Sequence, residues 1–217
     1  MLEIKRFVFG PFETNCYVVS DEQQILLVDP ACAYESEQQQ LLTYIENQKS
    51  KIKNLQLSIV ATHGHLDHLW GAAWACAKWN TPVLMHEADI PMAKAMQQQY
   101  DLFGIRAKAQ PFPIEDIKSK IKNHKFEISN FQLLSTPGHT PGSICLYFNT
   151  PSSSHLSPFI LSGDTLFKMG YGRTDLPGGN FSQLIDSLDL LLALPPETVV
   201  YPGHGAPTTI AAERRRW

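Results

Sequence analysis

The chain has 217 residues, a length that favours one domain and is ample for a hydrophobic core. Hydrophobic residues make up 43% of it and charged residues 18%, and the net charge of −3 argues against a nucleic-acid-binding surface. No apolar stretch reaches membrane-spanning length and the start MLEIKRFVFG lacks the features of a signal peptide, so we expect a cytoplasmic protein with no membrane partner.

The first half of the chain contains short apolar runs separated by turn residues, which are typical of strands. Strands are predicted over residues 3–9, 14–20, 24–29, 55–63 and 82–86. Apolar residues at helical spacing predict helices over residues 36–48, 66–79 and 88–100, the last with Pro91 in its first turn. Residues 100–125 lack clear periodicity and are interpreted as a long loop with at most one short helix. Such a loop is either a cover for an active site or a plain surface excursion.

The second half returns to short strands. A hairpin is predicted over residues 125–136 with Ser129 and Asn130 at its turn, and further strands over residues 143–149, 158–163 and 198–205. Residues 180–194 show a strongly amphipathic helical pattern that Asn180 or Ser182 is suited to cap. The order of strands and helices favours an α/β (α+β) fold in which two sheets pack face to face with helices outside. A single domain is predicted over residues 1–217.

The four cysteines form no CxxC pair. Each lies in an apolar stretch and is interpreted as a buried thiol. Unpaired thiols indicate a reducing compartment, which again favours the cytoplasm. The residues concerned are Cys16, Cys32, Cys76 and Cys145.

The segment ATHGHLDHLWG carries the densest set of potential metal ligands. His63, His65, Asp67 and His68 fall within six residues, directly after an apolar strand. Histidines two residues apart on an extended turn can both face one centre. Four polar side chains so close to a buried strand need partners or a metal to offset their desolvation. Imidazole nitrogen together with carboxylate oxygen suits zinc, iron or manganese.

Three further segments share one pattern, a short apolar run and a glycine followed by a possible ligand. FQLLSTPGH ends in His139, FILSGD ends in Asp164 and TVVYPGH ends in His204. If these runs are neighbouring strands, their ligand loops emerge at one rim of the sheets. Seven ligands are too many for one tetrahedral ion and suit two ions that share a carboxylate. The remaining histidines are interpreted as surface or core residues: His86, His124 and His155.

The motifs THGHLDH, TPGHTPGS, GDTLF and YPGHG together resemble those of the metallo-β-lactamase superfamily over nearly the whole chain. The phrase GDTLFKMGYGRTDLPGG resembles the glyoxalase II-like hydrolases, in particular their short bacterial form. The resemblance implies a four-layered αββα sandwich, the metallo-β-lactamase fold, with two divalent metals at one edge of the sheets. The ligands that it implies are His63, His65 and His139 for the first metal, Asp67, His68 and His204 for the second, and Asp164 as the bridge between them.

The expected reaction is hydrolysis by water that two metal ions activate. The ions share a hydroxide, which attacks an ester-like carbonyl, and they stabilise the oxyanion that develops. The carboxylates Asp67 and Asp164 are the catalytic candidates in the ligand set. No GxSxG elbow is present, so no serine nucleophile is expected. Zinc is the expected metal, with iron or manganese as alternatives.

The resemblance implies a small-molecule thioester substrate, because glyoxalase II proteins split S-lactoylglutathione into lactate and glutathione. Longer members carry a C-terminal helical domain whose basic residues hold glutathione, and here that domain is expected to be absent after YPGHGAPTTI. Arg173 is then the best cation for a substrate carboxylate, or else it ties down its own loop through Asp175. Tyr171 is a candidate for the wall of the substrate pocket.

Other activities of the same fold stay open. The segment GRTD also resembles persulfide dioxygenases, which would use one iron bound by His63, His139 and Asp164. The presence of His204 for a second metal favours the hydrolase instead. A metal-binding chain without activity is a further alternative. β-Lactamase and nuclease activities fit less well, because many two-zinc β-lactamases have cysteine where Asp164 stands and because the chain is acidic.

Overall fold

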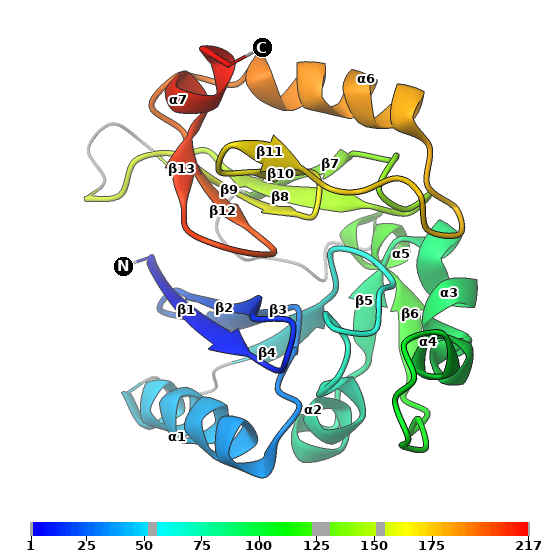
Figure 1. Ribbon diagram of the computed structural model, residues 1–217. Coiled ribbons are helices and arrows are strands. Elements are labelled where there is room, and N and C mark those ends of the chain that lie inside the picture. The colour runs from blue at the N-terminus through cyan, green and yellow to red at the C-terminus, as the bar shows by residue number, and fades with distance from the viewer. Residues whose placement is uncertain (1, 52–55, 123–130, 151–154, 217) are drawn as a thin grey trace. The chain divides into compact units, whose positions relative to one another are not determined.

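The computed structural model describes residues 2–51, 56–122, 131–150 and 155–216. Contacts between Cα atoms divide the chain into two compact units, Met1–Ile128 and Ser129–Trp217, called here the first and the second unit. Each unit contains a sheet of its own together with helices (Figure 1). None of the helices in the described residues is both long and apolar enough to cross a membrane.

The first unit is built on a six-stranded sheet in the order β1-β2-β3-β4-β5-β6. Strands β1, β2 and β3 pair antiparallel, whereas β3, β4, β5 and β6 pair parallel. The carboxyl ends of β3, β4 and β5 therefore meet at one edge of the sheet, and so do the loops that follow them. The strands are β1 (Glu3–Phe9), β2 (Thr14–Ser20), β3 (Gln24–Val28), β4 (Gln56–Val60), β5 (Val83–Met85) and β6 (Ile114–Asp116).

Helices of the first unit bury apolar side chains against this sheet. Leu41 and Ile45 of α1 and Ala75 of α2 belong to one apolar cluster with Ile25 and Leu27 of β3. Figure 1 shows α1 and α2 on the same face of the sheet. The helical segments are α1 (Glu35–Lys51), α2 (Ala72–Trp79), η1 (Glu87–Asp89), α3 (Ile90–Lys94), α4 (Met96–Leu102) and α5 (Ile117–Lys122).

The second unit has a five-stranded sheet in the order β13-β12-β9-β8-β7 and a two-stranded ribbon of β10 and β11. β7 and β9 each pair antiparallel with β8, and β12 pairs parallel with β9. β7, β9 and β12 thus run in one direction and end at the same edge. The strands are β7 (Phe131–Ser135), β8 (Ile144–Phe148), β9 (Phe159–Gly163), β10 (Leu166–Phe167), β11 (Gly170–Tyr171), β12 (Val199–Pro202) and β13 (Thr208–Thr209).

Two helices, α6 (Phe181–Leu192) and α7 (Ile210–Arg214), accompany the second sheet. α6 is the amphipathic helix predicted from the sequence, and its Leu184 and Leu188 belong to one apolar cluster with Ile160 of β9. Asn180 caps it, because its side-chain oxygen accepts a hydrogen bond from the backbone of Gln183 at 3.1 Å.

The helix predicted over residues 66–79 begins only at Ala72. The backbone N–H of Gly71 donates to the carbonyl of Pro30 at 2.7 Å. A Cβ at Gly71 would lie 2.3 Å from Sγ of Cys32, so the backbone there packs directly on the chain after β3. Because of this tertiary contact, residues 66–71 do not continue the helix toward the N-terminus. Asp67 and His68 therefore lie in a loop before α2.

Two other predictions need correction. The helix predicted over residues 88–100 is interrupted at Ala95, which separates α3 from α4. The segment 100–125, predicted as a loop with at most one short helix, contains such a helix, α5, but it also contains the strand β6, which was not predicted. β6 has only three residues, IED, and an edge strand so short and so acidic carries no readable pattern. The predicted turn at Ser129 and Asn130 lies outside the described residues.

The mixed α/β class predicted from the sequence is confirmed by these sheets and helices. The strands predicted over residues 3–9 and 14–20 have the predicted bounds in the structure. A single domain over residues 1–217 stays a prediction.

All four cysteines are free and buried, as predicted. Burial raises the pKa of Cys32 to about 12 and the pKa values of Cys76 and Cys145 to about 11, and it raises the pKa of Cys16 as well.

We therefore expect no thiol of the folded protein to react with DTNB at about pH 8, because the thiolate is the reactive form. All four should react once the protein is unfolded in guanidinium chloride. Rapid labelling of the folded protein would contradict this burial.

Candidate metal centre

Four potential ligands of the first unit lie in the loop after β4, at the carboxyl edge of the parallel strands. The ring centroids of His63 and His65 are 4.8 Å apart, and those of His63 and His68 are 4.1 Å apart. Nε2 of His68 lies 3.5 Å from Oδ2 of Asp67. The hydroxyl of Thr14 in β2 donates to that same oxygen of Asp67 at 2.8 Å and orients the carboxylate. The structure thus gathers the four side chains of this loop.

A buried carboxylate outside the predicted ligand set organises the loop. Asp29 follows β3 with a left-handed φ of 53°, a conformation that aspartate adopts more readily than most residues. Its carboxylate accepts hydrogen bonds from the backbone N–H of Thr62 at 2.7 Å and from the hydroxyl of Thr62 at 2.8 Å. Nδ1 of His68 lies 2.9 Å from Oδ2 of Asp29.

The contact with Asp29 selects the tautomer of His68. An ionised carboxylate only accepts hydrogen bonds, so Nδ1 of His68 carries the proton and Nε2 keeps the lone pair that a metal needs. The sequence prediction missed Asp29. Its place directly after a buried strand is the same signal that marks the predicted ligands.

The three potential ligands of the second unit follow β7, β9 and β12, which end at one edge of the sheet. Nε2 of His139 and Nε2 of His204 each lie 3.5 Å from Oδ2 of Asp164. The backbone N–H of Gly203 donates to the carbonyl of Gly163 at 2.7 Å and ties the end of β12 to the end of β9. The structure thus brings the imidazoles of His139 and His204 to one carboxylate oxygen.

The backbone of residues 172–173 orients His139. Nδ1 of His139 lies 2.7 Å from the carbonyl oxygen of Arg173. A carbonyl only accepts, so Nδ1 is the protonated nitrogen and Nε2 is the one directed at Asp164. A Cβ at Gly172 would lie 1.9 Å from the carbonyl oxygen of Asp164 and 3.0 Å from Nδ1 of His139. Only glycine permits so close an approach of this backbone to two potential ligands.

Arg173 and Tyr171, the predicted substrate contacts, lie beside this backbone. Nε of Arg173 is 2.7 Å from Oδ1 of Asp175, and Nη2 is 2.6 Å from Oδ2. Hydrogen bonds from the guanidinium lower the pKa of the Asp175 carboxyl to about 2. The pairing with Asp175 is therefore present, while the Arg173 side chain stays 57% exposed. Tyr171 is 41% exposed, with its ring against that of Phe181.

Among the described residues, neither His86 nor His155 belongs to a group of potential metal ligands. Nδ1 of His86 accepts a hydrogen bond from the backbone of Ala88 at 3.2 Å, so His86 caps η1. Burial lowers the pKa of His86 below its ordinary value. His155 is exposed, and His124 lies outside the described residues.

The donor types and spacings suit divalent metal ions. A tetrahedral ion with bonds of about 2.0–2.1 Å places its ligand atoms about 3.3–3.4 Å apart. Oδ2 of Asp164 lies 3.5 Å from Nε2 of both His139 and His204. Oδ2 of Asp67 likewise lies 3.5 Å from Nε2 of His68. Nitrogen and oxygen donors without a thiolate fit zinc, iron or manganese.

Comparison with known proteins agrees with these observations. A family model described as the metallo-beta-lactamase superfamily matches residues 9–204. The chain is 34% identical to the probable metallo-hydrolase YqgX of Bacillus subtilis, over 97% of this chain and 93% of that protein. It is 31% identical to the hydroxyacylglutathione hydrolase GloC of Haemophilus influenzae, over 94% of this chain and 91% of that protein. The crystal structure of TTHA1623 in a di-iron-bound form matches with a TM-score of 0.77 and 31% identity, over 97% of each chain.

The close packing at Gly172 predicts an asymmetry between two neighbouring glycines. Gly172→Ala should destabilise the metal-free protein by about 1–3 kcal/mol, because the added methyl group collides with the backbone of Asp164. Gly170→Ala is the matched control, since a Cβ there meets nothing within 4 Å. Thermal unfolding of the two variants measures the difference. Equal midpoints would contradict the packing described here.

Proposed function

We propose that this chain hydrolyses small-molecule thioesters with two divalent metal ions. The starting point is that the chain belongs to the metallo-β-lactamase superfamily of metal-dependent hydrolases. The proposed substrate class is that of S-lactoylglutathione. A relative named as a hydroxyacylglutathione hydrolase supports this class, since it matches 94% of this chain. Members with other reactions share the superfamily, so the substrate class rests on that relative and on the GDTLFKMGYGRTDLPGG segment.

The observation that carries the proposal is the position of Asp164. One of its oxygens lies 3.5 Å from Nε2 of both His139 and His204. In the proposed centre these histidines belong to different ions, so a carboxylate between them is suited to be shared. The proposed ligands are His63, His65 and His139 for one ion, Asp67, His68 and His204 for the other, and Asp164 for both.

Two divalent ions, when bound, lower the pKa of water and polarise the carbonyl to be cleaved. The chain's own part is to present its imidazoles in the required tautomer. Asp29 does this for His68, and the carbonyl of Arg173 does it for His139. Asp67 and Asp164 supply the negative charge that retains the cations, and they are the catalytic side chains of the proposal. Without these carboxylates the imidazoles alone would leave two dications uncompensated.

The same loop is proposed to bind the thiol-carrier part of the substrate. Arg173 is exposed even though it pairs with Asp175, so its guanidinium can also meet a carboxylate from solvent. Tyr171, which lies in the ribbon two residues before Arg173, is also exposed. Both residues adjoin the backbone that orients His139. A substrate bound there would thus lie next to a metal ligand.

Zinc is the metal we propose first, and the di-iron form of the similar structure supports iron as the main alternative. Nucleic acid and membrane are not among the proposed partners. The four free thiols suit a reducing compartment, and we propose the cytoplasm.

Loss of the shared carboxylate should remove the metals and the activity together. Wild-type protein loaded with zinc is expected to hold two ions per chain by elemental analysis and to hydrolyse S-lactoylglutathione or another acyl-thioester. Asp164→Ala should lower the bound metal and reduce the rate at least about 100-fold, because both ions lose a ligand. Asp186→Ala, on the exposed face of α6, is the control and should leave both unchanged.

The same measurements separate the alternatives. One iron per chain with consumption of oxygen in the presence of glutathione persulfide would favour the dioxygenase. Two ions without turnover of any thioester would favour a metal-binding protein that lacks activity. Full occupancy of both ions in Asp164→Ala would refute the sharing of this carboxylate.

A further inference from the structure

Two side chains outside the ligand set form hydrogen bonds with the turn that carries His63 and His65. Asp89, the last residue of η1, contacts this turn, and Gln99 contacts it from α4. Both contacts are made to the backbone of the turn. They therefore act on the path of the chain between the two histidines.

Asp89 holds the middle of the turn. Its side chain is fully buried, and Oδ2 accepts a hydrogen bond from the backbone N–H of Gly64 at 2.8 Å. A Cβ at Gly64 would lie 3.1 Å from the carbonyl oxygen of Asp89 and 3.2 Å from Cβ of Met92. The turn is thus packed tightly on the start of α3. Asp89 follows β5, so the parallel arrangement of β4 and β5 brings it to the same edge as the ligand loop.

Gln99 holds the turn at two points. Its Oε1 accepts a hydrogen bond from the backbone N–H of Leu66 at 2.9 Å. Its Nε2 donates to the carbonyl of Gly64 at 2.9 Å and to the carbonyl of Met92 at 3.0 Å. One amide therefore links the residue between the histidines, the residue after them and α3.

We propose that Asp89 and Gln99 are positioning residues that set the directions of His63 and His65 before metal arrives. This inference rests on the proposed metal centre. A ligand's direction follows from its backbone, and two ligands in one turn bind an ion well only when both directions are fixed together. Partners that orient ligands in this way commonly raise metal affinity about 10- to 100-fold. Asp89 and Gln99 act through the turn and need no contact with substrate.

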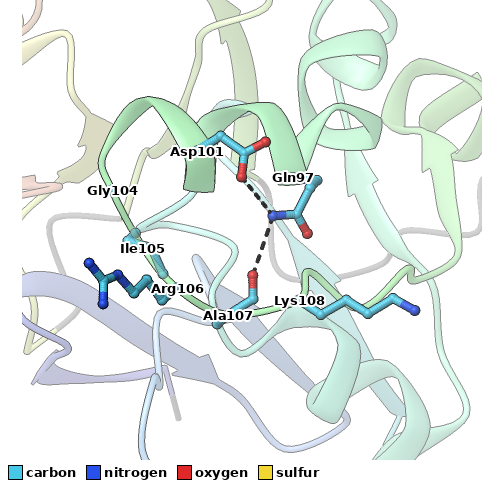
Figure 2. Close-up of a pocket in the computed structure, with 7 residues that line it drawn as sticks. All are labelled: Gln97, Asp101, Gly104, Ile105, Arg106, Ala107 and Lys108. Carbon is cyan, nitrogen blue, oxygen red and sulfur yellow. Dashed lines mark hydrogen bonds between the residues drawn. The ribbon is translucent and has the colours of Figure 1, made fainter.

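The chain offers a matched control on the same helix. Gln97 also makes three hydrogen bonds, to Asp101 at 3.0 Å, to the carbonyl of Ala107 at 3.3 Å and from the N–H of Ala109 at 3.0 Å. Figure 2 shows its amide between Asp101 and Ala107 at the pocket near Lys108. Gln97 thus fastens the segment after α4, and none of these bonds involves the ligand loop. Replacing Gln97 removes as many hydrogen bonds as replacing Gln99.

The experiment compares Gln99→Met with Gln97→Met in metal-free protein prepared with a chelator. The dissociation constants for Zn²⁺ are measured by competition with a chromophoric chelator, and the absorption spectrum of the Co²⁺-loaded protein reports ligand geometry. Gln99→Met is expected to weaken binding of the ion assigned to His63 and His65 about 10- to 100-fold, which raises one of the two Zn²⁺ dissociation constants, and to alter the Co²⁺ spectrum. Gln97→Met should stay within about 2-fold of wild type, even where both variants lose similar thermal stability.

The role of Asp89 is tested by comparing two variants, Asp89→Asn and Asp89→Ala. This comparison also tests the proposal if Gln99→Met fails to fold. Asp89→Asn keeps an oxygen acceptor for the N–H of Gly64, and its Zn²⁺ affinity should lie closer to wild type than that of Asp89→Ala. Equal Zn²⁺ affinities for Gln99→Met and Gln97→Met, or for the two Asp89 variants, would overturn the positioning role while leaving the metal centre intact. Wild-type protein that binds no metal would instead overturn the proposed function and this inference with it.

Discussion

The hydrogen bonds of the Asp29 carboxylate are the interaction on which the ligand loop of the first unit depends. This carboxylate is 1% exposed, and a charge so deeply buried is costly unless donors surround it. Thr62 supplies two of those donors and His68 a third. The same bonds that offset desolvation therefore fix the path of the chain into the loop and the tautomer of a potential ligand.

Parallel strands explain why such contacts form at all. In the first unit, the ends of β3, β4 and β5 bring Asp29, the ligand loop and Asp89 to one edge. In the second unit, the common direction of β7, β9 and β12 does the same for His139, Asp164 and His204. Each potential ligand follows a strand, so the sheet sets its position. Contacts from the backbone at Gly172 and from the side chain of Gln99 in α4 then act on its direction.

Much of the potential ligand set could be predicted because its members lie in the loops that follow short apolar runs, and that pattern is local in sequence. The fold class followed from the same runs. The contacts that orient the ligands could not be predicted, since Asp29 and Thr62 are 33 residues apart and Gln99 and Gly64 are 35 apart. The late start of α2 has a similar cause, because the contact of Gly71 with Pro30 overrides a favourable helical pattern. β6 was missed because its pairing with β5, rather than its own composition, makes it a strand.

We propose that the seven potential ligands hold two metal ions in one centre. X-ray absorption spectroscopy of the zinc- or iron-loaded protein tests it most directly, because scattering from a neighbouring metal is visible beside that of nitrogen and oxygen. We expect a metal–metal distance of about 3.5–4 Å. Two ions per chain with nitrogen and oxygen neighbours but no metal–metal scattering would contradict it.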